Sequence, residues 1–361
     1  MHFSMCLNTI FSMDPEIQSF IKVWFTAILS MIYCYCISVR LRGGATRLFS
    51  LLPVIYLFTT LPLHLTSIHI GAATILYLVW LGNFKLLLFS FDQGPLYATP
   101  PLSLFHFISI ALLPVETKHN SSCKSNAKVY HQPVASAVKV ALLAIFTRIY
   151  EYMENVHPYI LFTLYCCHLY LALEVILAIT AVPVRAILGL DLKPQFNEPY
   201  LATSLQDFWG RRWNLTVSSI LRTAVYQPVH RISTRILGSN WARPSATMAT
   251  FLVSGLMHEV IYYYLSGAYP TWEVTRFFVL HGICVALEMA VKKALGGRWR
   301  LHRLVSGPMT VAFVGVTGVW LFLPQVIRHG LDKKAISEYT ILTQFLLWIL
   351  CLCVISKTLL I

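Results

Sequence analysis

The sequence predicts an all-α fold, a polytopic transmembrane helical bundle of about nine spans with additional re-entrant or interfacial helices. Two observations carry this prediction. Of the 361 residues, 57% are hydrophobic and only 12% are charged, whereas an ordinary soluble domain has about 25% charged residues. The apolar residues also gather into long runs, most of them about 20 residues or more, which cross ~30 Å of hydrocarbon as a helix.

Nine runs are predicted to span the membrane. The six clearest carry few ionisable residues and are Phe20–Val39, Ile68–Phe91, Pro158–Pro183, Ala246–Leu265, Val305–Ile327 and Ile341–Ile361. Three weaker spans are Leu48–Leu65, Val134–Ile149 and Trp272–Ala290. The apolar segment Ser103–Leu113 is too short to cross a bilayer, so we expect it to be re-entrant or interfacial.

The formal net charge of +13 comes from 28 Lys and Arg against 15 Asp and Glu. The positive charges lie between the predicted spans, as the positive-inside rule describes, so we expect no nucleic-acid partner. Arg40–Arg47, Arg185–Arg243 and Lys292–Arg303 are the most basic stretches and should face the cytosol. The acidic turn Glu151–His157 should then face the lumen, provided that Ser103–Leu113 does not cross.

The stretch Pro194–Val229 is the longest one between confident spans. Ser204 and Asp207 stand three residues apart, which is the spacing of a capping box and predicts a helix start. Aromatic residues follow at helical spacing beside Arg211 and Arg212, which is typical of a helix at the membrane surface. A surface anchor does not explain Asn214, a polar amide placed where the chain turns apolar again.

His258 and Glu259 lie within Ala246–Leu265, about 18 Å from the start of the run at 1.5 Å per residue. Ionisable groups at this depth are costly and usually mark function. The chain has no HxxxH pair, no HExxH and no CxxC, so the sequence predicts no metal site and no cofactor. His258 is therefore better suited to proton transfer than to holding a metal ion.

Four stretches resemble one family. NEPYLATSLQDFWGRRWNL (Asn197–Leu215) and FLVSGLMHE (Phe251–Glu259) are its most specific motifs, and the resemblance extends through Leu301–Pro324 and Met13–Trp24. The chain is similar here to the membrane-bound O-acyltransferase superfamily, in particular to its plant wax synthase (long-chain-alcohol O-fatty-acyltransferase) branch. It departs in small ways, as at Thr223, where the branch would lead us to expect a proline.

The resemblance implies the membrane-bound O-acyltransferase fold as one integral domain over residues 1–361, with 1–12 as a possible extension and 194–265 as the catalytic region. It implies that His258 is the catalytic histidine and that Asn214 is its partner. It also implies residence in the endoplasmic reticulum membrane, with acyl-CoA and a lipid alcohol as substrates. We expect Arg211, Arg212 and Trp213 to bind acyl-CoA, although anchoring at the membrane surface is an equal alternative for the two arginines.

Ester synthesis from a thioester needs a base for the alcohol proton and a donor for the oxyanion. His258 suits the first task, while Asn214 can orient His258, bind the alcohol or stabilise the oxyanion. No Ser or Cys stands beside a base, so we expect direct attack without an acyl-enzyme. A sterol or diacylglycerol acyltransferase is the nearest alternative, and a transporter with an intramembrane His is a more distant one. The sequence does not predict the acyl chain length or the oligomeric state.

The loop charges predict an orientation that can be measured. Glycosylation acceptors inserted at Asn155 should be modified, because that turn is predicted to be luminal, whereas acceptors at Arg211 and Arg298 should stay unmodified. Modification at Arg298 would overturn the orientation.

Overall fold

The computed structural model describes residues 15–38, 40–116, 132–188, 192–296 and 301–339. Within these ranges the chain forms helices and loops but no β-strand. The α-helices are α2 (Pro15–Ser38), α3 (Ala45–Thr60), α4 (Ile68–Thr74), α5 (Asn83–Ser90), α6 (Leu104–Leu112), α7 (Gln132–Tyr150), α8 (Pro158–Leu188), α9 (Leu205–Asp207), α10 (Leu215–Leu221), α11 (Gln227–Ile236), α12 (Ser239–Ser266), α13 (Glu273–Ala294), α14 (Arg303–Thr317) and α15 (Leu323–Arg328). Three short 3-10 turns lie at Leu61–His64, Met153–Asn155 and Pro199–Leu201, and residues 331–339 are also helical.

Helices long and apolar enough to cross a membrane confirm the predicted class. Six of them are present among the described residues, at Pro15–Ile37, Ala45–His64, Ile68–Ser90, Pro158–Val182, Glu273–Ala294 and Arg303–Arg328. The predicted spans Val134–Ile149 and Ala246–Leu265 are helical within α7 and α12, but these two helices are not among the six. Ile341–Ile361 lies outside the described residues, so nine spans remain a prediction.

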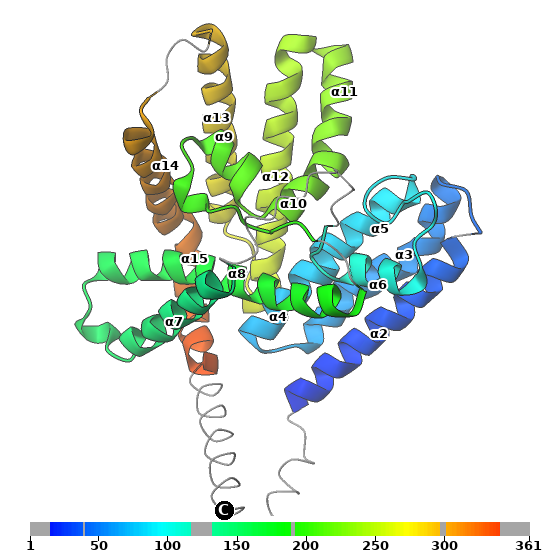
Figure 1. Cartoon of the computed structure of the whole chain (residues 1–361), viewed down its shortest axis with the longest axis horizontal. Coiled ribbons are helices and arrows are strands. Elements are labelled where there is room, and N and C mark those ends of the chain that lie inside the picture. The colour runs from blue at the N-terminus through cyan, green and yellow to red at the C-terminus, as the bar shows by residue number, and fades with distance from the viewer. Residues whose placement is uncertain (1–14, 39, 117–131, 189–191, 297–300, 340–361) are drawn as a thin grey trace, which may run out of the picture.

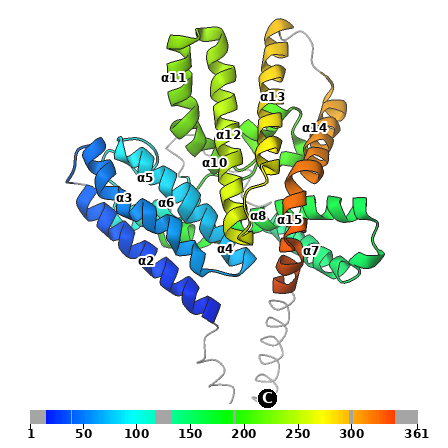
Figure 2. The same ribbon diagram turned by 180° about the vertical axis from the view of Figure 1, so that it is seen from behind.

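The helices form two groups around a central pair (Figure 1). Helices α2 to α6 lie together on one side, α7, α14 and α15 lie on the other, and α12 and α13 stand between them. Both views show α11, α12 and α13 projecting beyond the other helices at one end (Figure 2). The loop that carries α9 and α10 packs beside this central pair.

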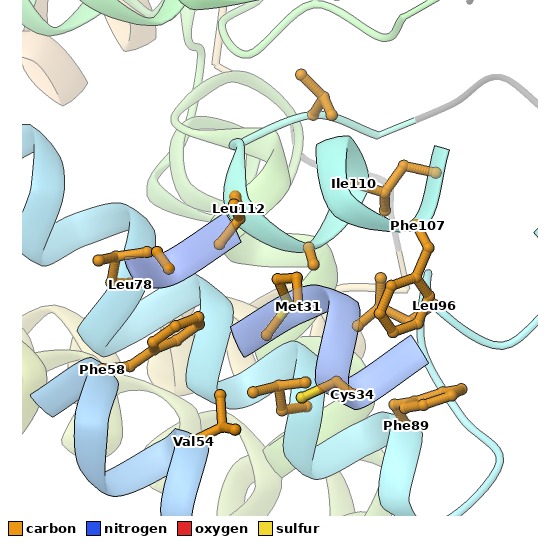
Figure 3. Close-up of a cluster of buried hydrophobic side chains, with 14 of the residues drawn as sticks. Met31, Cys34, Val54, Phe58, Leu78, Phe89, Leu96, Phe107, Ile110 and Leu112 are labelled. Atoms are coloured by element: carbon orange, nitrogen blue, oxygen red, sulfur yellow. The ribbon is translucent and has the colours of Figure 1, made fainter. Parts of the chain in front are cut away.

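The first group has its own apolar core. Side chains from α2, α3 and the helix Ile68–Ser90 meet those of α6, with Met31, Phe58 and Leu86 fully buried (Figure 3). Aromatic rings of Phe89 and Phe107 pack edge to face at 5.3 Å. This core holds α6 against the bundle.

Helix α6 is too short to cross a membrane, because its nine residues extend only about 14 Å. The fully buried Lys85 donates from Nζ to the carbonyl oxygens of Ile110 and Leu113, each at 2.6 Å. These carbonyls lie at the end of α6, where a helix leaves its last C=O groups without internal partners. An intramembrane lysine thus caps a helix that ends inside the bundle, as expected for a re-entrant segment.

Contacts between loops agree with the predicted sidedness. On the side predicted to be luminal, Glu273 in the first turn of α13 makes two hydrogen bonds of 3.0 Å with Arg328 at the end of α15. At the other end Lys193 pairs with Glu116 at 2.6 Å, both predicted to be cytosolic. This pair is compatible with either course of α6, because the two predicted spans between Glu116 and Lys193 return the chain to the same side.

Two carboxylates hold the start of α4. Glu16 accepts hydrogen bonds from the backbone N–H groups of Thr66 and Ser67. Glu338 accepts from the N–H of Ile68 at 2.5 Å and from His69 Nδ1 at 2.7 Å. Burial alone would raise the pKa of Glu338, but these hydrogen bonds lower it to about 2. The helix start and the orientation of His69 are both fixed by this contact.

Four segments of the described chain are π-helical, and each directly follows an α-helix. They are Ile75–Gly82, Phe208–Arg212, Arg222–Tyr226 and Gly318–Phe322. Such segments are rare and often occur at functional sites.

Candidate active site

A mainly apolar cavity of about 800 Å³ lies between the two helix groups. Each of the four π-helical segments contributes to its wall, for example through Trp80, Trp209, Arg222 and Phe322. The predicted catalytic pair, His258 and Asn214, lines the same cavity. The structure therefore brings together two residues that are 44 positions apart in the sequence.

His258 is held in one orientation by α12. Its Nδ1 lies 2.7 Å from the carbonyl oxygen of Ser254, one turn earlier. A carbonyl oxygen can only accept, so Nδ1 carries the proton, and in a neutral ring Nε2 presents a lone pair. No described residue hydrogen-bonds to Nε2. The imidazole is thus arranged as a proton acceptor.

Three aromatic rings enclose the imidazole of His258. Phe278 of α13 stacks on it with ring centroids 4.4 Å apart, and Trp80 meets it edge to face at 5.0 Å. Phe322 approaches at 5.7 Å. These rings come from three helices, and they leave His258 little freedom to rotate.

Close packing of α12 and α13 brings Phe278 to His258. A Cβ atom at Gly255 would lie 3.0 Å from Thr275 Cα, and one at Gly282 would lie 3.0 Å from Phe251 Cβ. Small residues allow two membrane helices to approach this closely.

Glu259 does not join His258 in the cavity. Its side chain is buried against α13, where Oε1 accepts a hydrogen bond from the backbone N–H of Thr275 at 3.1 Å. That N–H belongs to the first turn of α13 and has no partner within the helix. The structure therefore gives Glu259 a capping role, and its neighbour His258 alone faces the cavity.

Asn214 is the N-cap of α10. Its Oδ1 accepts from the backbone N–H of Val217 at 3.2 Å, and its φ of 35° lies in the left-handed region that Asn tolerates better than most residues. Because Oδ1 is used in this way, the amide NH₂ is the group left for a ligand. Among the described residues, Asn214 and His258 form no hydrogen bond with each other.

The loop before Asn214 starts with the predicted capping box. The backbone N–H of Asp207 donates to Ser204 Oγ, which confirms that prediction. The aromatic residues that follow pack inside the protein, contrary to a surface anchor: Phe208 is buried, and Trp213 stacks on it at 5.4 Å. Trp213 also lines the cavity.

The two predicted acyl-CoA arginines differ in their surroundings. Arg212 pairs with Asp207 at 2.7 Å and donates to the carbonyl oxygens of Asn197 and Glu198, so its guanidinium is occupied by the protein. Arg211 is exposed and does not line the cavity. Arg222 does line the cavity and forms no ion pair with any described residue. The sequence analysis missed Arg222, because its position on the cavity wall depends on how the chain folds.

The sequence analysis also missed His281, which is fully buried. Trp209 Nε1 donates to His281 Nδ1 at 3.0 Å, and His281 Nε2 donates to Thr317 Oγ1 at 2.9 Å. Trp209 in turn packs on Phe278, with ring centroids 5.7 Å apart. His281 thus positions a wall residue two contacts away from His258.

No group of three or more His, Cys, Asp and Glu residues in the described ranges is placed to hold a metal ion.

Comparisons with known proteins agree with the resemblance. The profile of the Membrane bound O-acyl transferase family matches residues 192–280, which contain both Asn214 and His258. The chain is 51% identical to the long-chain-alcohol O-fatty-acyltransferase of Simmondsia chinensis, over 92% of this chain and 96% of that protein. It is 47% identical to the probable long-chain-alcohol O-fatty-acyltransferase 1 of Arabidopsis thaliana (90% and 96%) and 41% identical to the acyl-CoA–sterol O-acyltransferase 1 of the same plant (91% and 96%).

Because Trp209 and His281 share a hydrogen bond, substitutions at the two residues should have non-additive effects on the free energy of unfolding. His281→Phe leaves the Trp209 N–H buried without an acceptor, and Trp209→Phe leaves His281 Nδ1 without a donor, so each should lower the free energy of unfolding by about 1–3 kcal/mol. The double variant should lose less than the sum. His281→Gln is the control, because an amide can accept and donate at similar positions. Thermal unfolding in detergent measures all four, and strictly additive losses would contradict the coupling.

Proposed function

The chain belongs to the membrane-bound O-acyltransferase family, in its plant long-chain-alcohol O-fatty-acyltransferase branch. From this premise we propose that it forms wax esters from a long-chain acyl-CoA and a long-chain fatty alcohol, with His258 as the general base. The protein is a multi-pass membrane protein. Residence in the endoplasmic reticulum is part of the proposal, as is a reaction that needs no cofactor beyond the acyl-CoA substrate.

One observation carries the proposal: His258 lines an apolar cavity with Nδ1 bound and Nε2 free. Nε2 takes the proton of the alcohol while the alcohol oxygen attacks the thioester carbonyl carbon. The tetrahedral intermediate then collapses, the C–S bond breaks, and the imidazolium returns the proton to the leaving thiolate. Every atom of the ester and of free CoA comes from the two substrates.

Asn214 is proposed as the donor to the substrate oxygen that gains negative charge. Its Oδ1 is engaged with Val217, so only the NH₂ group faces a ligand. A preorganised N–H donor stabilises an oxyanion without reorganisation during the reaction. The N-cap contact keeps the amide from turning its oxygen toward that charge.

The acyl-CoA site is proposed to use Arg222, with Trp213 as part of the cavity wall. Arg222 combines a place on the wall with a guanidinium that pairs with no described residue. The exposed Arg211 is retained as a second contact. The bonds of Arg212 to Asp207 and to two carbonyls support a structural role for it instead.

A sterol acceptor is the alternative with a specific observation behind it. A relative named as an acyl-CoA–sterol O-acyltransferase is 41% identical over 91% of the chain. An assay of membranes that contain the protein, with labelled acyl-CoA and a choice of fatty alcohol, sterol or diacylglycerol, separates the acceptors. Ester formed chiefly from sterol would replace the proposed substrate.

His258→Ala should abolish ester formation and leave the amount of membrane-inserted protein nearly unchanged. General-base catalysis typically contributes ~10²–10⁴-fold in rate. The matched control is His157→Ala, because His157 is exposed in the turn before α8. Ester formation by His258→Ala at more than a tenth of the wild-type rate would refute the assignment.

Arg222→Gln should raise the KM for acyl-CoA about tenfold or more and leave the KM for the alcohol unchanged, because a charge-assisted hydrogen bond contributes ~1.5–3 kcal/mol. Arg212→Gln should instead lower the amount of folded protein, since it breaks the pair with Asp207. Arg235→Gln, an exposed change on α11, serves as the control. Equal changes in both KM values for Arg222→Gln would contradict its role.

A further inference from the structure

The cavity that holds His258 has a second polar region. His69, Tyr150, Tyr165, His168, Asp332 and Tyr339 all line it, and we call this group the far chamber. Its members come from α4, α7, α8 and the helical residues 331–339, which lie far apart in the sequence. The far chamber and His258 share one cavity, so one ligand can contact both.

The far chamber is a connected cluster. The rings of His69 and Tyr339 lie 4.2 Å apart, and those of His168 and Tyr339 lie 5.3 Å apart. Tyr150 packs between Tyr165 at 5.3 Å and His168 at 5.5 Å. Tyr165 donates to Asp332 Oδ2 at 3.1 Å, and Glu338 fixes His69 through Nδ1.

Three polar atoms of the far chamber are buried without a hydrogen-bond partner among the described residues: Tyr150 Oη, His168 Nδ1 and Asp332 Oδ1. Tyr150 is only 2% exposed. A buried polar group without a partner is costly, and three on one part of the wall of a mainly apolar cavity indicate a ligand that supplies the missing bonds.

The wall between the two polar regions is apolar. Phe322 touches the ring of His258 at 5.7 Å, and its neighbour Leu323 packs against Tyr150 and Tyr165. Both Phe322 and Leu323 line the cavity. A ligand that reaches from His258 to the far chamber is therefore polar at each end and apolar between.

The charges of the far chamber favour a neutral group. Asp332 and Glu338 would repel a carboxylate at the far end of a ligand. A hydroxyl can donate to Asp332 Oδ1 and accept from Tyr150 Oη–H at the same time. The alkyl chain that carries this hydroxyl matches the apolar wall formed by Phe322 and Leu323.

We propose that the protein acylates long-chain α,ω-diols, with one hydroxyl at His258 and the other held in the far chamber by Tyr150 and Asp332. This inference rests on the proposed function. The attacking hydroxyl loses its proton through His258 to the CoA thiolate, as for a simple alcohol. The second hydroxyl does not react, so the products are an ω-hydroxy ester and free CoA.

The test compares α,ω-diols of increasing length with primary alcohols of the same carbon number. At the length that spans His258 and the far chamber, kcat/KM for the diol should exceed that for the alcohol about tenfold, because a site built for a hydroxyl discriminates against its absence. Tyr150→Phe and Asp332→Asn should bring this ratio close to one by lowering kcat/KM for the diol. Tyr159→Phe, at an exposed position of α8, should keep the wild-type ratio.

A binding measurement separates this proposal from the proposed function. Purified His258→Ala protein without acyl-CoA should melt at a higher temperature with the diol of optimal length than with the matched alcohol. Adding Tyr150→Phe should remove that difference, while the melting temperature of the unliganded protein should not fall, since the deleted hydroxyl has no partner. Equal rates and equal stabilisation for diol and alcohol at every length would overturn the far chamber as a hydroxyl site and leave wax ester synthesis standing.

Discussion

The close contact between α12 and α13 is the interaction on which the site depends. Gly255 and Gly282 allow the two helices to approach, and the hydrogen bond from the Thr275 N–H to Glu259 fixes their relative register. Phe278 then reaches the imidazole of His258 and stacks on it. Lipid tails are as apolar as helix surfaces, so close packing and interhelical hydrogen bonds, rather than the hydrophobic effect, hold such helices together.

The π-helical segments explain how a bundle of packed helices contains so large a cavity. A π turn places an extra residue in the helix and shifts the side chains that follow. Trp80, Trp209, Arg222 and Phe322 each come from such a segment, and all of them line the cavity. The same backbone irregularity that would weaken an ordinary helix thus directs side chains toward the cavity.

Two buried polar residues outside the cavity, Lys85 and His281, serve the helices rather than the chemistry. Lys85 caps α6, and His281 joins Trp209 to Thr317. Each satisfies backbone or side-chain groups that would otherwise be unpaired in an apolar environment. In the far chamber, unlike at Lys85 and His281, Tyr150 Oη, His168 Nδ1 and Asp332 Oδ1 have no partner among the described residues.

The sequence by itself determined the helical membrane class and the start of the helix at Leu205, and it singled out His258 as the candidate base that the proposed function uses. Long apolar runs, the Ser204 and Asp207 spacing and an ionisable group deep in an apolar run are local features, so they can be read without knowing the contacts. Only the tertiary structure decided that Arg212 is engaged by the protein while Arg222 lines the cavity, that Trp209 bonds His281, and that His69, Tyr150 and Asp332 meet. Apart from Asp207, which stands shortly before Arg212, these partners are distant in sequence, and hydrophobic periodicity indicates which face of a helix is buried but not which helix it meets.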